Sequence, residues 1–278
     1  MKKSTVFLFL SIGLITVFLY FKPGAELPAS PVQPALKLCK PAQAKIDLNA
    51  CRDNFLVLLK VRNDAAALAE IEKVLAVNSA DIEALWGKAE VLRRGYSFAE
   101  SEKILQQVLS QNPGHTSSLI SLSYIRYHDG RFEEALALLK KVLGQRNLSR
   151  ENKALSYMLI GSINAKKASL GGLFSKVVYG THIRGYFEKA KHLAPDLSEV
   201  YLGLGTFYLL APRIVGGDTQ RAIVELETAV RLTPDFATAN VRLAQAYKKK
   251  RNTEKYNFYF QQAQRLDPNN EILKELKD

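Results

Sequence analysis

The residue types that most often bind metals or carry out catalysis are few and scattered in this chain. The four histidines show no spacing typical of zinc ligands; they are His115, His128, His182 and His192. A zinc site would require histidines from separate segments to meet in the folded chain. We therefore expect surface or loop histidines.

The glycine pairs and the acidic residues form no catalytic motif either. Neither Gly171-Gly172 nor Gly216-Gly217 precedes the Gly-Lys-Ser/Thr sequence of a phosphate-binding loop, and no Gly-x-Ser-x-Gly elbow occurs. Glu133 and Glu134 lie in a segment with helical periodicity, where solvated charge is the ordinary expectation. The sequence predicts neither an enzyme nor a bound cofactor or metal.

The two cysteines, Cys39 and Cys51, flank the start of the first expected helix. In an oxidising compartment, a pair this close can form a disulfide that joins the N-terminal segment to the folded part. The alternative is that Cys51 is a small buried core residue and Cys39 a free thiol. Both alternatives remain open from the sequence.

The first residues have the pattern of an export signal. Lys2 and Lys3 precede an apolar run from Val6 to Phe21, which is shorter than the roughly 20 residues of a membrane helix and so favours a cleaved signal peptide. The poor cleavage site at Leu27-Pro28-Ala29 keeps an uncleaved anchor open. In both cases the two lysines hold the N-terminus inside, and the rest of the chain is exported.

The expected location is the periplasm of the cell envelope. Residues 1–21 are the signal peptide or anchor, with residues 5–21 in the inner membrane if they are retained. Residues 22–46 contain five prolines with little apolar periodicity, which is typical of an extended extracytoplasmic spacer.

The formal net charge of +12 suits acidic partners, anionic head groups or envelope polymers, although general solubilising charge explains it as simply. No nucleic-acid partner is expected, because no recognised binding motif occurs and an exported chain rarely meets nucleic acid.

An internal repeat organises the remainder of the chain. Arg231-Leu232-Thr233-Pro234 recurs 34 residues later as Arg265-Leu266-Asp267-Pro268, and Ser79 and Pro113 are separated by the same 34 residues. Proline cannot continue a helix, so these positions mark where one helix pair ends and the next begins.

Four positions within each unit carry a regular set of side chains. The eighth position is mostly small: Phe55, Ala89, Ser123, Gly161, Gly205 and Ala244. The twentieth is also mostly small: Ala67, Ser101, Ala135, Ile183, Ala222 and Tyr256. The twenty-fourth is large and apolar: Ile71, Leu105, Leu139, Phe187, Leu226 and Phe260. The twenty-seventh is Val74, Val108, Val142, Ala190, Ala229 and Ala263. Small residues let two helix axes approach closely, and the large ones fill the space beside them.

This pattern resembles the tetratricopeptide repeat over about residues 48–270. The resemblance implies an all-α fold, a right-handed superhelical solenoid of about six helix-turn-helix units with a C-terminal capping helix, spanning residues 47–278. The units are expected at 48–81, 82–115, 116–153, 154–197, 198–236 and 237–270. No unit can bury its apolar face alone, so stacking makes the core continuous.

Two insertions are expected within the helix hairpins of the fourth and fifth units, near residues 169–182 and 211–218. Their glycines allow backbone angles closed to other residues, and Asp218 is placed to cap the next helix. Both insertions emerge on one edge of the solenoid. They form a docking edge or an oligomer contact, or they are only longer turns. The candidate contact residues are Tyr179, His182, Arg213 and Asp218.

In the tetratricopeptide family, ligands usually lie in a concave groove lined by the first helix of each unit. Transferred to this chain, the candidate groove residues are Arg52, Trp86, Glu90, Tyr124, His128 and Met158. An apolar floor with a basic border suits an extended or helical peptide, with Trp86 and Tyr124 as anchors, although bulky residues there also serve packing. The Lys and Asn clamp of the chaperone adaptors is absent.

The sequence thus favours an extracytoplasmic scaffold that binds a protein or peptide partner through its groove and assists an envelope complex. A homo-oligomer is compatible with the insertions, and membrane contact is expected through the N-terminal segment only. The Gly-Gly-Asp turn after a proline is also similar to one in the T component of TRAP-type transporters. That similarity implies an alternative function as an accessory subunit of a periplasmic solute transport system.

Overall fold

Residues 47–171 and 173–277 are described in the computed structural model, without the side chains of residues 173–181 and 277. The signal or anchor segment expected at 1–21 and the spacer expected at 22–46 lie outside the described residues, so both stay predictions. In the part of the chain that the structure describes, no helix is both long enough and apolar enough to span a bilayer.

The described residues form thirteen α-helices and one short 3₁₀ turn, with no strand. Six hairpins follow one another: α2 (Leu48–Lys60) with α3 (Asp64–Val77), α4 (Ile82–Arg94) with α5 (Phe98–Gln111), α6 (Thr116–His128) with α7 (Phe132–Leu143), α8 (Arg150–Leu170) with α9 (Leu173–Leu193), α10 (Ser198–Leu210) with α11 (Thr219–Leu232), and α12 (Ala237–Lys249) with α13 (Thr253–Leu266). A last helix, α14 (Glu271–Lys277), packs on α12 and α13. The predicted all-α fold of six units with a C-terminal capping helix is confirmed.

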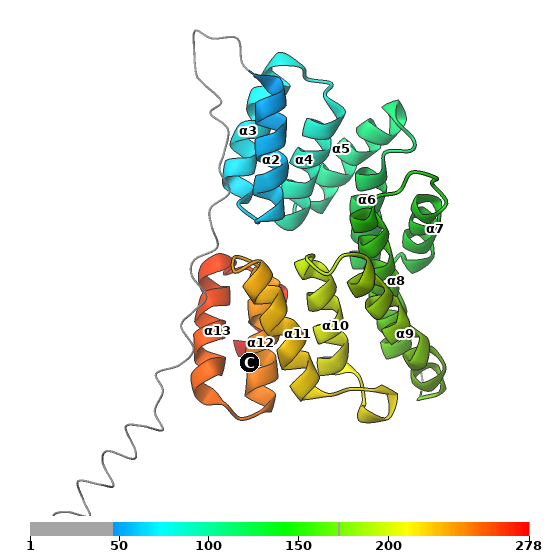
Figure 1. Cartoon of the computed structure of the whole chain (residues 1–278), viewed down its shortest axis with the longest axis vertical. Helices are drawn as coiled ribbons and strands as arrows, with labels where there is room; N and C mark the ends of the chain where they lie inside the picture. Colours follow the sequence, from blue (N-terminus) through cyan, green and yellow to red (C-terminus); the bar gives the residue numbers. More distant parts are fainter. Residues whose placement is uncertain (1–46, 172, 278) are drawn as a thin grey trace, which may run out of the picture. The chain divides into compact units, whose positions relative to one another are not determined.

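The hairpins stack so that their first and second helices form two layers (Figure 1). Each first helix contacts the first helix of the next hairpin, in the order α2, α4, α6, α8, α10 and α12. Second helices of successive hairpins lie farther apart, and α9 and α11 meet through Nζ of Lys191 and Oε1 of Glu225 at 2.8 Å. The row of first helices therefore forms the concave side, where the sequence placed the groove.

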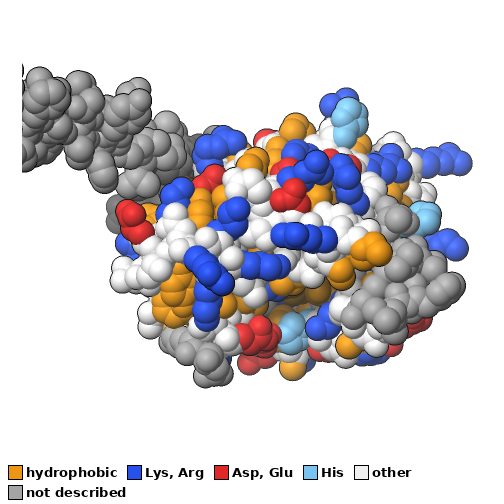
Figure 2. Space-filling model, turned by 90° about the horizontal axis from the view of Figure 1, so that it is seen from below, with side chains coloured by type: hydrophobic (Ala, Val, Ile, Leu, Met, Phe, Trp, Pro, Cys, Tyr) orange, Lys and Arg blue, Asp and Glu red, His pale blue; other side chains and the backbone are white. Residues whose placement is uncertain are grey.

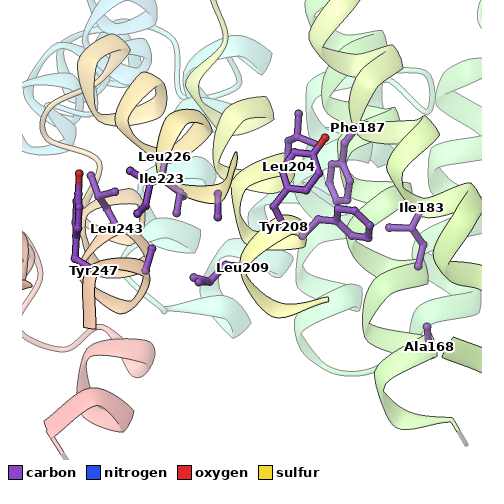
Figure 3. Packing of buried hydrophobic residues seen from close by; sticks show 13 residues of the cluster. Ala168, Ile183, Phe187, Leu204, Tyr208, Leu209, Ile223, Leu226, Leu243 and Tyr247 are labelled. Atoms are coloured by element: carbon purple, nitrogen blue, oxygen red, sulfur yellow. The ribbon is translucent and has the colours of Figure 1, made fainter. Parts of the chain in front are cut away.

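The positions that repeat along the sequence form the core. All six residues at the eighth position are buried, and the twenty-seventh position is fully buried in every unit. Figure 3 shows how these layers join: Phe187 of α9, Leu204 of α10, Leu226 of α11 and Leu243 of α12 belong to one cluster. The core is thus continuous from hairpin to hairpin, as expected for stacked units.

Glycines lie where a large side chain needs room. The Phe187 ring is so near that a Cβ atom at Gly203 would lie 2.8 Å from its Cε1 atom, and one at Gly161 would lie 3.1 Å from its Cζ atom. At Gly205, a Cβ atom would lie 2.6 Å from Cγ of Leu226. Real Cβ atoms essentially never approach closer than 3.0 Å, so larger residues at Gly203 and Gly205 would force the helices apart.

Phe55 departs from the small-residue rule and is nevertheless fully buried. Its ring occupies space that Gly87 of α4 leaves open, since a Cβ atom at Gly87 would lie 3.2 Å from Cε2 of Phe55. The first hairpin therefore keeps its close packing by exchanging the large and small partners between neighbouring helices.

The fourth unit differs from the prediction in two respects. Its first helix begins at Arg150, ahead of the expected boundary at 154, because the Ser149 hydroxyl accepts a hydrogen bond from the Asn152 N–H at 3.1 Å. The first insertion lengthens α8 and α9 to 21 residues each. Gly171 has φ of −84°, which any residue adopts, so the prediction of a glycine-specific backbone is wrong at this position. Gly172, the other glycine of the predicted pair, lies outside the described residues.

The second insertion agrees with the prediction. It contains the 3₁₀ turn η1 (Arg213–Val215), and Gly216 after it has φ of 100°, in the left-handed region that favours glycine. The Asp218 carboxylate accepts hydrogen bonds from the N–H groups of Gln220 at 2.8 Å and Arg221 at 3.2 Å. The predicted cap of α11 by Asp218 is confirmed.

In several units, the residue at the fifteenth position adopts a left-handed backbone in the turn between the two helices of the hairpin. Gly130 adopts it in the third unit with φ of 76°, whereas Arg62, Tyr96 and Arg251 adopt it with φ of 62°, 65° and 59°. A non-glycine residue in this region costs about 1 kcal/mol or more. Such strain persists only where the surrounding structure holds it.

Arg62 and Tyr96 use these turns to reach later hairpins. Nη2 of Arg62 donates to Oε1 of Glu199 at 2.7 Å, and its guanidinium carbon lies 3.5 Å from the ring centroid of Phe236. The Tyr96 hydroxyl donates to Oδ2 of Asp267 at 2.9 Å. The turns of the first two hairpins thus contact the starts of α10 and α12 and the turn before α14.

Replacing Gly205 with alanine should lower the free energy of unfolding by about 1 to 3 kcal/mol, because the new methyl group overlaps Leu226. Gly185→Ala is the matched control, since Gly185 is an exposed glycine in α9 with nothing within 4 Å of its Cβ position. The control should gain up to about 1 kcal/mol of helix propensity. Urea denaturation followed by circular dichroism measures both; equal effects would contradict the close-packing account.

Arg251→Gly should raise the free energy of unfolding by about 1 kcal/mol, because glycine relieves the left-handed strain. Arg62→Gly relieves the same strain but leaves Glu199 without its cation, and we expect a net loss of about 2 kcal/mol. Thermal denaturation of both variants separates the cost of the turn from the value of the contact. A stabilised Arg62→Gly variant would show that the contact between hairpins contributes nothing.

Candidate functional site

Arg52 lies on α2 and joins the first two hairpins. Its guanidinium donates to Asp81, the N-cap of α4, and to Oδ1 of Asn49 at 3.1 Å. The charge of this candidate groove residue is therefore compensated inside the fold.

Trp86 and Glu90 come together on the inner side of α4. The indole N–H of Trp86 donates to the Ser121 hydroxyl of α6 at 3.2 Å, and that hydroxyl donates to Oε2 of Glu90 at 2.9 Å. The Trp86 ring also packs against the core clusters of the first and second hairpins. Both candidates thus bind neighbouring hairpins to each other.

Glu90 is buried between two arginines of its own helix. Its Oε1 atom accepts from Nη2 of Arg93 at 2.5 Å and from Nε of Arg94 at 3.0 Å. Burial alone would raise the pKa of Glu90, but the charges and hydrogen bonds of Arg93 and Arg94 outweigh it and hold that pKa well below its ordinary value. Glu90 therefore stays ionised inside the fold.

The charged contacts continue across hairpins. Nη1 of Arg94 donates to the Leu59 carbonyl at 2.9 Å and to Oδ1 of Asp64 at 2.8 Å. Burial lowers the pKa of Arg62, and the charge of Arg94 lowers it further against the opposing effect of Glu199. We call these residues the arginine-carboxylate cluster: Arg62, Asp64, Glu90, Arg93, Arg94 and Glu199. In it, each arginine lies against at least one carboxylate.

Tyr124 and Tyr127 extend this surface along α6. The guanidinium carbon of Arg93 lies 4.1 Å from the Tyr124 ring centroid, and the two tyrosine rings meet edge to face with centroids 6.1 Å apart. Burial raises the pKa of Tyr127, and the Arg242 charge partly opposes this. Arg242 belongs to α12, so the third and sixth hairpins face each other here.

Arg242 is a cation beside Tyr127 that has no carboxylate partner among the described residues. It is partly buried, and its Nη1 atom donates to Oε1 of Gln245 at 2.8 Å. Among the described residues, no carboxylate oxygen lies within 4.0 Å of its guanidinium nitrogens. Burial lowers the pKa of Arg242, which Glu275 and Tyr127 only partly oppose from a greater distance. The guanidinium thus has donors left for an incoming acceptor.

His128 and Met158 contact residues other than the groove candidates. His128 is exposed at the end of α6, with its ring centroid 4.2 Å from that of Phe98 and Nε2 3.7 Å from a carboxylate oxygen of Glu271. Met158 of α8 packs against two core clusters. The structure therefore brings together Trp86, Glu90 and Tyr124 but not the whole candidate set. Their role in partner binding stays a prediction.

The insertion residues lie on one edge, since α9 packs against η1. Arg213 and His182 are exposed, and Asp218 is partly buried at the start of α11. The side chain of Tyr179 lies outside the described residues. Contact of these residues with a partner remains a prediction.

Cys51 is fully buried in α2 and is disulfide-bonded. This is consistent with the first of the two alternatives for the cysteines. The predicted partner, Cys39, lies outside the described residues, so the pairing itself stays a prediction.

Sequence reasoning missed Arg62, Arg93, Glu199 and Arg242 as residues of the inner surface. The Arg93-Arg94 pair one turn after Glu90 was a visible signal, because opposite charges three and four residues apart meet on a helix. Arg62 and Glu199 are 137 residues apart, and no periodic pattern links them.

Glu90→Gln should lower the free energy of unfolding by about 3 kcal/mol near neutral pH, because Arg93 loses its carboxylate and Arg94 keeps only that of Asp64. The folded-state pKa of Glu90 is depressed, so its contribution is present above the ordinary glutamate pKa of about 4.3 and is lost as the pH falls below it. The variant should therefore lose less stability on acidification than the wild type. Urea titrations at several pH values measure this. Glu133→Gln, an exposed partner of Lys167, is the control and should change little.

Two stretches of the chain match a known family. Residues 97–149 and residues 237–270 each match the tetratricopeptide repeat. Over 83 residues the chain is 31% identical to the tetratricopeptide repeat domain-containing protein PYG7, chloroplastic, of Arabidopsis thaliana. That alignment spans 30% of this chain and 26% of the relative.

Solved structures with the same architecture are distant in sequence. A human IFIT1 dimer with m7Gppp-AAAA has a TM-score of 0.62 at 19% identity, over 86% of this chain and 54% of that one. A tetratricopeptide repeat protein from Parabacteroides merdae has a TM-score of 0.54 at 15% identity, over 83% and 82% of the two chains. At these identities the similarity shows the fold alone, and this chain spans about half of IFIT1 and about a quarter of PYG7.

The two matched stretches contain the third and sixth hairpins, and the other hairpins repeat their buried positions along the same stack. The chain is a member of the tetratricopeptide repeat superfamily.

Proposed function

We propose that this protein is an exported scaffold that binds a protein or peptide partner along its row of first helices and assists a complex of the cell envelope. Support for export comes from the lysines and apolar run at the N-terminus. Support for a binding role comes from the repeat architecture, whose concave side presents one helix from every unit.

The observation that carries this proposal is Arg242. A partly buried guanidinium without a carboxylate partner is costly in a free protein, because burial removes water that would otherwise solvate the charge. Its planar set of donors matches a carboxylate, which it can hold through two parallel hydrogen bonds. The Tyr127 hydroxyl lies on the facing helix and stays neutral, so it can donate as well.

The partner proposed here therefore presents an acidic side chain or a terminal carboxylate between α6 and α12. The other inner arginines named above are already matched by carboxylates of this chain: Arg52, Arg62, Arg93 and Arg94. Arg242 thus favours a partner with a negative charge at this position. Tyr124 and Tyr127 offer aromatic contact beside it.

A photo-crosslinking amino acid at Gln245, one turn from Arg242, tests this in the full chain within its native envelope. We expect crosslinked products that fall at least tenfold in Arg242→Gln, with unchanged circular dichroism, since a charge-assisted hydrogen-bonded contact contributes about 1.5 to 3 kcal/mol. Arg265→Gln is the matched control: Arg265 is an exposed arginine of α13 that also hydrogen-bonds a glutamine three positions away, Gln262.

No crosslinked product at position 245 in the wild type would count against binding along the first helices. Products unaffected by Arg242→Gln would show binding there without a carboxylate at Arg242. Equal losses in Arg242→Gln and Arg265→Gln would indicate a general effect of charge.

A further inference from the structure

The turns of the fourth and fifth hairpins expose apolar side chains to solvent. Ile214 is 85% exposed, Leu170 69% and Leu210 54%. Leu170 and Leu210 end α8 and α10, and Ile214 lies in η1, which packs against α9. We call the surface formed by residues 166–171, 209–218 and 248–252 the basic edge; it lies at the bottom of Figure 1 and faces the viewer in Figure 2.

Unpaired basic side chains surround these apolar ones. Five exposed residues of the basic edge have no carboxylate oxygen within 4.0 Å in the described part of the chain: Lys166, Arg213, Lys249, Lys250 and Arg251. The Lys249 ammonium donates to the Leu209 carbonyl at 3.0 Å, which keeps the end of α12 beside that of α10. Figure 2 shows Lys and Arg side chains distributed across this face, with hydrophobic side chains between them and smaller groups of Asp and Glu side chains.

Two carboxylates next to the basic edge are occupied within the fold. Asp218 caps α11 and lies 3.5 Å from the Arg221 guanidinium. Glu227 accepts from the Tyr247 hydroxyl at 2.5 Å and lies 3.6 Å from the Lys255 ammonium. The basic edge therefore carries a local excess of positive charge rather than a set of ion pairs.

The backbone holds Ile214 outward. The N–H groups of Val215 and Gly216 donate to the carbonyls of Pro212 and Arg213, both at 3.0 Å, which closes a tight turn. Gly216 permits it by its left-handed φ. The exposure of Ile214 thus belongs to an ordered turn in which the side chain points into solvent.

A shallow cavity of about 350 Å³ opens on the same edge between α11, α12 and α13. Its lining includes the Lys250 and Lys255 ammonium groups, which can donate hydrogen bonds, and the Glu227 carboxylate, which lies 3.6 Å from the Lys255 ammonium. Lys250 is therefore the cation of this lining that is left for a lipid phosphate.

We infer that the basic edge docks on an anionic lipid surface, with Leu170, Leu210 and Ile214 entering the head-group layer and the surrounding cations contacting lipid phosphates. Apolar tips ringed by lysine and arginine are the arrangement that binds at a membrane interface. Charge complementarity selects the lipid surface, because a second copy of this edge would bring like charges together.

This inference is independent of Arg242 and of the peptide partner. The sequence predicts membrane contact through the N-terminal segment only. Docking through the basic edge would be a second membrane contact. A single weak anchor binds reversibly, whereas two act together. Docking through the edge would also orient the row of first helices relative to the bilayer.

The test uses the full chain reconstituted into vesicles of phosphatidylcholine, alone or mixed with phosphatidylglycerol, with brominated acyl chains as a contact quencher. An environment-sensitive fluorescent amino acid replaces Ile214, and in the control it replaces Val77, a 57% exposed residue at the end of α3. We expect a blue shift and bromine quenching at position 214 in the mixed vesicles only, and neither at position 77.

Substitutions of the cations and of the apolar side chains test their separate contributions to lipid binding. Lys250→Ser and Arg251→Ser should each weaken the quenched state about fivefold, because a cation near an anionic bilayer contributes roughly that factor. Leu210→Ser should weaken it further, whereas Val77→Ser should not. Absence of quenching at 214 in both vesicle types overturns the inference. A blue shift that grows with protein density without bromine quenching overturns it in favour of contact between copies.

Discussion

Two helices of a hairpin can pack only as closely as the side chains between their axes allow, and the whole stack depends on this limit. The first helix of a hairpin contributes a small residue to this interface, such as Ala89, Gly161 or Gly205. The second helix fills the space beside it with a large one, such as Leu105, Phe187 or Leu226. At Gly203 and Gly205 the space left is smaller than a methyl group. Because every hairpin also supplies a wall of the next, an error at one of these positions would propagate to its neighbours.

Buried charged residues join hairpins that apolar packing does not connect. The arginine-carboxylate cluster places three arginines and three carboxylates in a desolvated region, where each charge requires an opposite one. Through Arg62 and Glu199 it also joins the first hairpin to the fifth, which share no apolar core cluster. The strained turn at Arg62 is consistent with this use, since glycine would fit the backbone better but make no contact.

The two proposed binding surfaces differ in physical character. On the inner surface, Arg242 offers one partly buried charge beside aromatic rings, which favours a specific acceptor in a defined position. On the basic edge, exposed cations surround apolar tips, which favours a fluid surface of many weak contacts. A scaffold with both can hold a partner beside the bilayer, because the basic edge lies at the ends of α8, α10 and α12 and Arg242 lies about two turns before it on α12.

The sequence by itself determined the all-α fold, the hairpins and nearly all of their buried positions, because a 34-residue period places the same side-chain sizes at the same helical contacts. It also determined the cap at Asp218, since capping is local chemistry. It misjudged the backbone at Gly171 and the start of α8, where a longer helix and the Ser149 cap replaced a loop. Only the tertiary structure decided that Glu90 is enclosed by arginines and that Arg242 faces Tyr127 from a hairpin more than a hundred residues away. Those contacts depend on how the stack curves, and curvature is a sum of small rotations between units that no single repeat encodes.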